Sequence, residues 1–383
     1  MIYCDFNAGA PVRPQVVEAM TRGLAIGGNP SSVHQIGRRA RAAVEHARAQ
    51  VAALAGARPD EVVFTSGGTE ANNLALAGFA PAAMLVSAIE HDSVLAMAQH
   101  ATCLPVLADG VIDMDALNEA LADVSKPIIV SVMLANNETG VIQPIAEVAR
   151  RAHEVGAIVH CDAVQAAGRL PVEFAAMGVD LMTLSAHKIG GPQGVGALIV
   201  RDGVTVEPLM RGGGQERRLR AGTENVAGIV GFGVAAECAL GELDQVGKIA
   251  EMRDALEAKL RRIAPDVAVY GTDAPRLANT SCIGMPDVSG ETQVMAFDLD
   301  GIAVSAGAAC SSGKVTQSHV LRAMGAGEQA AGEAIRISLG ALTKDADIEA
   351  VSETWRKLHE RTRARLVAPL ANPVTTSAAR TAA

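Results

Sequence analysis

One lysine, Lys188, lies between two short apolar runs, where its amine could do covalent chemistry. The run that ends at Ser185 is followed by Ala186-His187-Lys188, then by the glycine-rich segment 189–196, and then by a second apolar run at 197–200. Short apolar runs bounded by glycine and proline are typical of buried strands, so the spacing predicts Lys188 at a strand end beside bare backbone. A partly desolvated lysine near another positive charge or dipole has a lowered pKa, and its free amine can attack a carbonyl carbon. The pattern therefore predicts a Schiff-base lysine, against the background that most lysines are solvated surface charges.

A second chemical signal is a candidate anion-binding turn. Residues 62–65 have the composition of a strand, Ser66-Gly67-Gly68 that of a tight turn, and Thr69 begins a helix that extends to about Gly78. The first amides of a helix have no partner within the helix, and the helix dipole adds positive potential there. The hydroxyl of Thr69 could join them, so we expect a phosphate group at this turn; the alternative is an ordinary helix N-cap.

Alternating strands and helices must position these groups. Between residues 84 and 160, apolar runs alternate with segments of helical spacing such as 145–154, an order that predicts a parallel sheet with crossover helices. In open α/β sheets, ligands bind at the carboxyl ends of the strands. We therefore expect three polar clusters that follow strands to share one crevice with Lys188, namely Glu90-His91-Asp92, the segment 136–140 and the segment 162–165.

The length of the chain, 383 residues, favours a large domain with a smaller one beside it. We expect residues 1–12 to form an N-terminal arm that packs with the small domain, and residues 13–262 to form the large domain. Residues 263–367 would form a small α+β domain, and residues 368–383 a disordered tail. The small-residue segment 305–314 would be a mobile loop with Cys310 near its tip.

Composition argues against several classes of protein. With 33 lysines and arginines against 42 acidic residues, the net charge is -9, which argues against nucleic acid as the main partner. The N-terminus lacks the features of a signal peptide and no apolar stretch reaches membrane-spanning length, so we expect a cytoplasmic protein without a membrane partner. The six cysteines form no C-x-x-C pair and no metal-ligand spacing. Cys103, Cys161 and Cys282 lie in or beside apolar runs, where we expect inert thiols.

Six motifs in order along the chain carry a family resemblance. They are the segments 65–73, 136–140, 162–165, 185–188, 220–226 and 309–313. Together they resemble the cysteine desulfurases, above all the nitrogen-fixation and iron-sulfur-cluster type, within the class V aminotransferase group of fold type I pyridoxal-phosphate enzymes. The resemblance covers about Met1 to Lys357. It implies an α/β fold with a large, mostly parallel sheet domain and a smaller α+β domain. It also implies conversion of L-cysteine to L-alanine, with sulfur passed to an iron-sulfur scaffold or another acceptor protein.

The resemblance implies a role for each matching residue. Lys188 would hold pyridoxal 5'-phosphate and move the substrate Cα proton, His91 would stack on the pyridine ring, and Asp162 would pair with the ring nitrogen. Arg336 would bind the substrate carboxylate, and Cys310 would accept the sulfur as a persulfide. The other cofactor contacts would come from Gln165 and Asn136 at the phenolic oxygen, and from Gly68, Thr69, Ser185, His187 and Thr223 at the phosphate. Asn136 would also lie near the substrate, and Thr223 would reach across from the second subunit of a homodimer.

The chain departs from the family pattern in two places, and other functions compete with this one. It has Asn7-Ala8-Gly9 where relatives commonly carry a pair of threonines, and Gly190 and Gln193 where relatives usually have bulkier or basic residues. The alternatives are a selenocysteine lyase, a class V transaminase, and a non-catalytic scaffold of a sulfur pathway. Cys310 argues against the transaminase, and the presence of both Lys188 and Asp162 argues against the scaffold.

Overall fold

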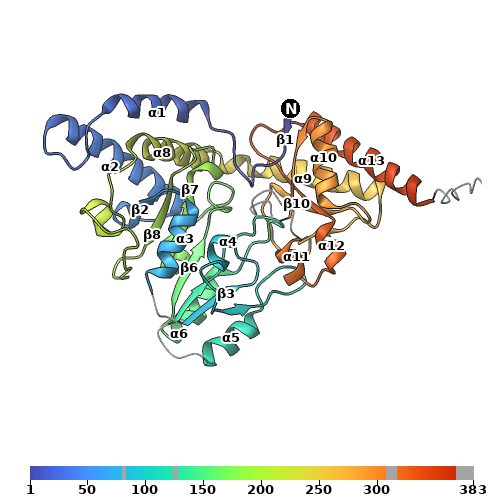
Figure 1. The fold of residues 1–383 in the computed structure, drawn as a ribbon, viewed down its shortest axis with the longest axis horizontal. Coiled ribbons are helices and arrows are strands. Elements are labelled where there is room, and N and C mark those ends of the chain that lie inside the picture. The colour runs from blue at the N-terminus through green and yellow to red at the C-terminus, as the bar shows by residue number, and fades with distance from the viewer. Residues whose placement is uncertain (80–82, 124–127, 308–316, 368–383) are drawn as a thin grey trace, which may run out of the picture.

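The fold consists of two adjoining units, each built around its own sheet. The structure is a computed structural model, and it describes residues 1–79, 83–123, 128–307 and 317–367. Figure 1 shows the larger unit with the central sheet and the helices α1, α2 and α8, and the smaller unit with α9, α10 and α13. Cys310 and the predicted tail at 368–383 lie outside the described residues.

The larger unit contains a seven-stranded sheet in the order β2-β8-β7-β6-β5-β3-β4. Neighbouring strands from β4 to β7 pair in parallel, whereas β8 is antiparallel to both β2 and β7. This arrangement confirms the predicted large, mostly parallel sheet. The strands are β2 (Val62–Thr65), β3 (Ala83–Ser87), β4 (Thr102–Leu104), β5 (Ile128–Ser131), β6 (Ile158–Asp162), β7 (Leu181–Ser185) and β8 (Gly196–Val200).

Helices cover this sheet with their apolar sides. In α6 (Ile145–Glu154) the buried residues Ile145, Val148, Ala149 and Ala152 recur at helical spacing, so one stripe of the helix faces the core. Helix α8 (Val226–Gly241) packs against α1 (Pro14–Ile26) and α2 (Gln35–Ala55). The other helices of this unit are α3 (Gly68–Ala77), α4 (Asp92–Leu95), α5 (Met114–Asp123) and α7 (Phe174–Met177).

The smaller unit has a four-stranded sheet in the order β12-β13-β10-β9, with antiparallel pairs throughout. Its strands are β9 (Val269–Tyr270), β10 (Thr280–Gly284), β12 (Ser305–Ala306) and β13 (Ala334–Ser338). Strand β1 (Ile2–Tyr3) pairs in parallel with β11 (Ile302–Ala303), which attaches the start of the chain to this unit. The helices are α9 (Val246–Ile263), α10 (Gly290–Leu299), α11 (His319–Ala323), α12 (Glu328–Gly332) and α13 (Asp345–Val367).

The packing of α9 bears on where the two units meet. Its buried residues Met252, Leu256 and Leu260 belong to the apolar cluster of the smaller unit, together with Trp355 of α13. This packing favours a change of unit at the bend between α8 and α9, rather than after α9. The predicted domain boundaries, including the one between residues 262 and 263, stay predictions.

Within the described ranges, no single helix is both long and apolar enough to cross a membrane. One pair of helices, Val226–Gly241 with Leu243–Ile263, meets the length and composition criteria only when taken together, and it is bent by 46°.

Candidate active site

Lys188 lies at the carboxyl end of β7, in the short 3-10 helix Ala186–Lys188. Its Nζ donates hydrogen bonds to the backbone oxygens of Asn7, at 2.5 Å, and of Ala8, at 3.0 Å. The amine is therefore half-buried against the N-terminal segment. The strand-end position and the buried flanking strands β7 and β8 agree with the spacing in the sequence.

Asn7, which the sequence marked only as a departure from the family pattern, organises this region. Its backbone oxygen accepts from Lys188 and from Nε2 of Gln165, at 3.0 Å. Its buried side chain donates to Thr280 and to the carbonyl of Asn137. Asn7 therefore connects the lysine to both units, a role that could not be read from spacing because its partners are far away in the sequence.

Of two other departures, Gly190 makes room for the N-terminal segment and Gly9 does not need to. The backbone of Gly190 has φ +79°, and a Cβ there would lie 2.8 Å from Cγ of Arg13. A Cβ on Gly9 would lie 3.7 Å from the ring of His187, which is an ordinary van der Waals contact. Glycine at 190 is thus required by both backbone conformation and close packing.

A continuous chain of hydrogen bonds joins Asp162 to His91. Nδ2 of Asn72 donates to Oδ2 of Asp162 and to Oγ of Ser93, both at 2.8 Å. Ser93 in turn lies 2.8 Å from Nδ1 of His91, and its amide also donates to that nitrogen. Asp162 is 6% exposed, so its carboxylate is held at the end of β6 with a defined orientation. Asn72 and Ser93 are positioning residues that the sequence analysis missed.

The amino end of α3 lies against the ends of β6 and β7. The helix begins at Gly68 without a side-chain cap, which leaves its first amides available to an anion. A Cβ on Gly68 would lie 3.1 Å from Val164 and 3.6 Å from Cβ of Ser185, so glycine permits this close approach. Thr69 is exposed on the first turn.

Ser185 and His187 form a hydrogen-bonded pair beside this turn, with Oγ and Nδ1 separated by 2.9 Å. Burial, and then the positive charges of Lys188 and Arg169, lower the pKa of His187 to about 4. The imidazole is therefore neutral near pH 7 and serves as a hydrogen-bonding group rather than as a cation.

Asn136 and Asn137 have different surroundings. Oδ1 of Asn136 accepts from the amides of Glu138 and Thr139, and its Nδ2 donates to the carbonyl of Ile89. These bonds stabilise the loop and leave the Asn136 side chain no free capacity for a ligand. The side chain of Asn137 is partly exposed and makes no hydrogen bond to the described part of the chain. The role predicted for Asn136 stays a prediction, and the geometry favours Asn137 for it.

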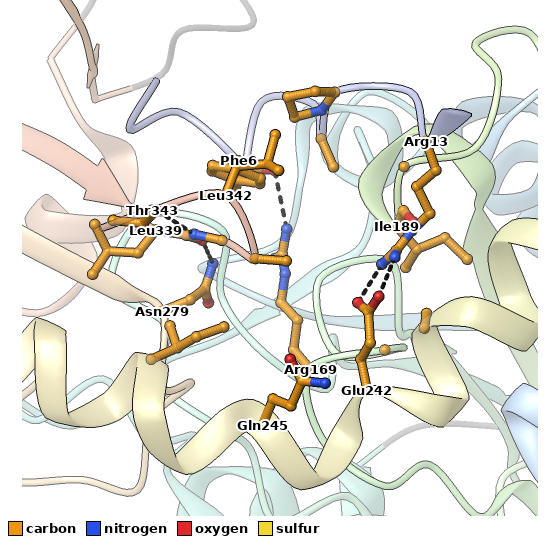
Figure 2. Close-up of a pocket in the computed structure, with 18 of the residues that line it drawn as sticks. Phe6, Arg13, Arg169, Ile189, Glu242, Gln245, Asn279, Leu339, Leu342 and Thr343 are labelled. Atoms are coloured by element: carbon orange, nitrogen blue, oxygen red, sulfur yellow. Dashed lines mark hydrogen bonds and ion pairs between the residues drawn. The ribbon is translucent and has the colours of Figure 1, made fainter. Parts of the chain in front are cut away.

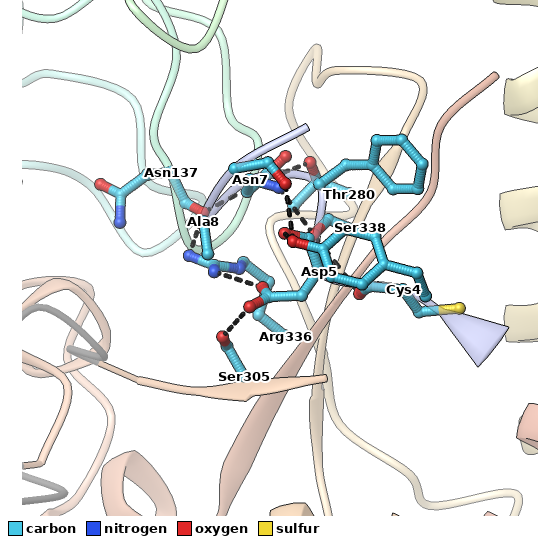
Figure 3. A network of polar contacts seen from close by, with 12 residues as sticks. Cys4, Asp5, Asn7, Ala8, Asn137, Thr280, Ser305, Arg336 and Ser338 are labelled. Carbon is cyan, nitrogen blue, oxygen red and sulfur yellow. Dashed lines mark hydrogen bonds and ion pairs between the residues drawn. The ribbon is translucent and has the colours of Figure 1, made fainter. Parts of the chain in front are cut away.

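Arg336 lies in a polar network between the two units (Figure 3). It is 4% exposed, its Nη2 donates to Oδ1 of Asp5 at 2.8 Å, and its Nη1 donates to the carbonyl of Asn137 at 3.0 Å. Its Nε is buried and has no hydrogen-bond partner within the described ranges. A buried unpaired donor is costly, so Nε is available to an incoming carboxylate.

A buried carboxyl group lies next to His91. Burial, and then the negative charge of Asp162, raise the pKa of Glu90 well above its usual value. One Glu90 oxygen accepts from the amide of Met133 at 2.6 Å. The hydrogen bond from Met133 fixes the loop that carries His91, and the raised pKa favours the protonated form of Glu90, which places no second negative charge beside Asp162.

Four of the six cysteines have thiols whose surroundings shift the pKa. Cys4, Cys161 and Cys282 are buried, and burial raises the pKa of each thiol. Cys103 was expected to be an inert thiol in an apolar run, yet it is exposed on the edge strand β4; partial burial still raises its pKa. A thiolate nucleophile needs a lowered pKa, and none of these four thiols has one. The predicted nucleophile, Cys310, lies outside the described residues.

The donor set fits a phosphorylated pyridine aldehyde. An amine at Lys188, a buried carboxylate at Asp162 and an uncapped helix end at Gly68 would match the aldehyde, the ring nitrogen and the phosphate respectively. Thr223 is exposed just before α8, where the described chain alone does not enclose it.

Comparison with known proteins places this arrangement in context. Residues 2–351 match the family model described as aminotransferase class V. The chain is 41% identical over 377 residues to "Cysteine desulfurase IscS" of Dictyoglomus turgidum, covering 94% of this chain and 95% of that protein. It is 44% identical over 366 residues to a cysteine desulfurase of Sinorhizobium fredii, covering 91% and 94%. The solved structure of a NifS-like protein from Rickettsia africae is similar with a TM-score of 0.89 and 38% identity, covering 94% of this chain and 99% of that one.

Proposed function

The chain belongs to the class V aminotransferase family and, within it, to the cysteine desulfurases, and from this membership we propose how its own residues carry out the reaction. The enzyme depends on pyridoxal phosphate and converts L-cysteine to L-alanine with release of sulfur to an acceptor. When bound, pyridoxal phosphate supplies a carbonyl carbon for an amine and an electron sink for bond cleavage at the substrate Cα.

Residues at the ends of β6 and β7 would hold the cofactor. Lys188 would hold the aldehyde carbon and Oδ2 of Asp162 would keep a proton on the ring nitrogen, supported by the hydrogen bond from Asn72. His91 would stack on the ring, and Gln165 would donate to the phenolic oxygen. The first amides of α3, with Gly68, Thr69, Ser185 and His187, would bind the phosphate.

Arg336 would orient the substrate through its carboxylate. The unpaired Nε and the second hydrogen on Nη2 form the side-on fork that matches two carboxylate oxygens. The side chain of Asn137 would face the same space and steady the substrate amine. Lys188 would then move the proton at Cα, because its amine lies at this end of β7.

Cys310 would carry the sulfur away. Its thiolate would attack the sulfur of the bound substrate, so that an S–S bond forms as the C–S bond breaks, and the carbon product would leave as alanine after protonation. Two observations support this role: four other thiols have raised pKa values, and Cys310 follows a run of small residues after β12.

We also propose a homodimer in which the exposed Thr223 contributes to the phosphate site of the second subunit. If the phosphate site needs the Thr223 hydroxyl of the other subunit, a single chain cannot complete the site. Dimerisation would then be required for full cofactor binding. The sulfur acceptor would be a protein such as an iron-sulfur scaffold.

The observation that carries the proposal is the hydrogen-bonded chain from Asp162 through Asn72 and Ser93 to His91, at the strand ends beside Lys188. These hydrogen bonds hold the Asp162 carboxylate and the His91 imidazole in defined orientations, as two groups that contact one ring would require. The test is to mix the purified protein with L-cysteine and a reductant and to measure visible absorbance, sulfide and alanine. Changing Lys188 to Ala should abolish both the absorbance of the lysine-bound cofactor and alanine formation. Normal turnover by that variant would contradict the role of Lys188.

The thiol can be tested separately. Cys310→Ala should retain the absorbance of the bound cofactor and lose sulfide release, whereas Cys103→Ala, the matched change at an exposed cysteine, should keep both. Equal loss in the two variants would contradict a specific role for Cys310.

A further inference from the structure

A cavity of about 380 Å³ lies between the N-terminal segment and the bend that joins α8 to α9 (Figure 2). Of the described residues assigned above to cofactor and substrate, only Lys188 lines it. The cavity is therefore distinct from the space around Asp162 and His91. A volume of a few hundred Å³ is typical of small-molecule sites.

One wall of the cavity carries Arg169, whose charge has no counter-ion among the described residues. Its guanidinium donates to oxygens without charge, namely the carbonyl of Phe6 at 3.0 Å and the carbonyl and side-chain oxygens of Gln165. In the part of the chain that the structure describes, no carboxylate pairs with it. Burial, and then the positive charge of Arg336, lower the pKa of Arg169 to about 9. The guanidinium is poorly solvated and would be stabilised by an anion.

The other charges that line the cavity also favour an anionic ligand. Apart from Lys188, which would hold the cofactor, three basic side chains, Arg13, Arg169 and Lys248, and one acidic side chain, Glu242, line the cavity. Glu242 is already bound by Arg13 through contacts of 2.5 and 2.7 Å, a pair visible at one edge of Figure 2. This excess of positive charge occurs in a chain whose net charge is -9. Cationic ligands are therefore disfavoured, and anions are favoured.

The rest of the lining is largely apolar. Phe6, Ile189, Ile249 and Leu342 contribute aromatic or aliphatic surface. Contact between this apolar surface and a hydrocarbon chain would remove both from water and so favour binding. An inorganic anion alone would leave the apolar surface in contact with water. A ligand that suits the whole cavity has one anionic end and an aliphatic body.

We propose that this cavity, the Arg169 cavity, binds a small aliphatic carboxylate, with the carboxylate on the Arg169 guanidinium and the hydrocarbon against Ile249 and Leu342. The guanidinium fork matches two carboxylate oxygens. Arg169 also bonds to Gln165, and Gln165 donates to the backbone oxygen of Asn7 that accepts from Lys188, so a ligand on Arg169 would be linked to Lys188 through these hydrogen bonds.

The test is isothermal titration calorimetry of the cofactor-loaded full chain, under conditions that allow it to dimerise, with octanoate as the ligand. Uncharged 1-octanol and cationic octylamine are titrated separately as controls. Octanoate should bind saturably with one site per chain, and the other two compounds should bind at least ~10-fold more weakly, as expected for loss of a charge-assisted hydrogen bond. Hydrogen exchange of the amides of residues 6–13 should slow when octanoate is added.

Two variants act on the cavity in different ways. Arg169→Met removes the charge at similar length and should weaken octanoate about 10-fold or more. Leu342→Trp narrows the cavity without touching Arg169, and should also weaken binding; Leu342 is 67% exposed, so this variant is expected to fold. Arg356→Met on the exposed side of α13 is the matched control and should leave octanoate affinity unchanged.

The outcomes separate clearly. Binding that is lost in both cavity variants and retained in Arg356→Met supports the proposal, whether or not the chain proves to release sulfur from cysteine. Absence of octanoate binding to the loaded full chain overturns it, because the cavity is then filled by another part of the chain or by a second subunit. Equal affinity for octanoate and 1-octanol, or equal affinity of Arg169→Met and the unsubstituted chain, also overturns it.

Discussion

Asn136 and Asn137 are neighbours in the sequence, but their side chains differ in how many hydrogen bonds they already make. Asn136 is fully buried and uses both side-chain atoms within its own loop and with Ile89. Asn137 contributes its backbone oxygen to Arg336 and Asn7, while its side chain is partly exposed. Truncating a residue that stabilises a loop lowers the stability of the protein, whereas truncating a residue that contacts a ligand lowers ligand binding or activity.

The two asparagines can be told apart by alanine substitution. Asn136→Ala should lower the free energy of unfolding by about 2–4 kcal/mol, because buried donors and acceptors lose their partner. Asn137→Ala should change it by less than about 0.5 kcal/mol and should lower kcat/KM for L-cysteine. Urea unfolding and steady-state kinetics check both results. The reverse pattern would return the ligand-contacting role to Asn136.

A second residue, His160, makes stability depend on pH. It lies on β6, is fully buried, and shares its ring nitrogens with Ser131 and Thr183. Burial lowers its pKa to about 4, against about 6.5 in an unfolded chain, and Asp162 only partly offsets this. Between these two values the unfolded chain binds more protons than the folded one, so protonation favours unfolding.

The free energy of unfolding should therefore fall as the pH decreases from about 6.5 to about 4, with His160 contributing up to ~1.4 kcal/mol per pH unit. The same contribution should be constant above pH 6.5 or so. His160→Gln should flatten this slope, and His100→Gln, a change at an exposed position, should not. Urea unfolding at a series of pH values measures the slope; an unchanged slope in His160→Gln contradicts the prediction.

At the scale of elements, the 3-10 segment Gln215–Arg218 is held in an unfavourable backbone conformation. Glu216, Arg217 and Arg218 have φ values of 41°, 54° and 69°, in the left-handed region that side chains other than glycine rarely adopt. The buried Glu216 secures the segment by accepting from Arg48 through two contacts of 2.7 and 2.8 Å, and from the amide of Phe64. A buried ion pair thus offsets local backbone strain.

Arg218→Gly should raise the free energy of unfolding by about 1 kcal/mol, because glycine adopts a positive φ without a steric cost. Arg218→Ala keeps the Cβ and removes the same exposed side chain, so it should leave stability nearly unchanged. Thermal unfolding of the two variants separates the backbone effect from the side-chain effect. If the glycine variant were no more stable than the alanine variant, the strain would be absent.

At the scale of the whole molecule, local patterns predicted the elements well, and long-range contacts account for what they missed. The strand at 62–65 and the helix at 145–154 have the predicted bounds, because each is encoded by periodicity within a short window. The contact of Lys188 with Asn7 joins residues that are far apart in the sequence, as does the link between Asn72 and Asp162. Such pairs become neighbours only when the sheet forms, so spacing alone could not reveal them.

The structure also distinguishes Asn136 from Asn137, which the sequence could not do. Both residues have the same side chain and lie in the same motif, and only the course of the loop decides which side chain is used in hydrogen bonds within the loop. The role predicted for Asn136 stays a prediction.

The most direct test of the central claim, that Lys188 and Cys310 together move sulfur from L-cysteine to the protein, is mass spectrometry after a single turnover. The cofactor-loaded chain would be treated with one equivalent of L-cysteine without reductant, blocked with an alkylating agent and digested. The account predicts that the peptide containing Cys310 gains the mass of one sulfur atom, in step with the alanine formed. Extra sulfur on Cys103 or Cys238 instead, or alanine formed without any sulfur on Cys310, would contradict it.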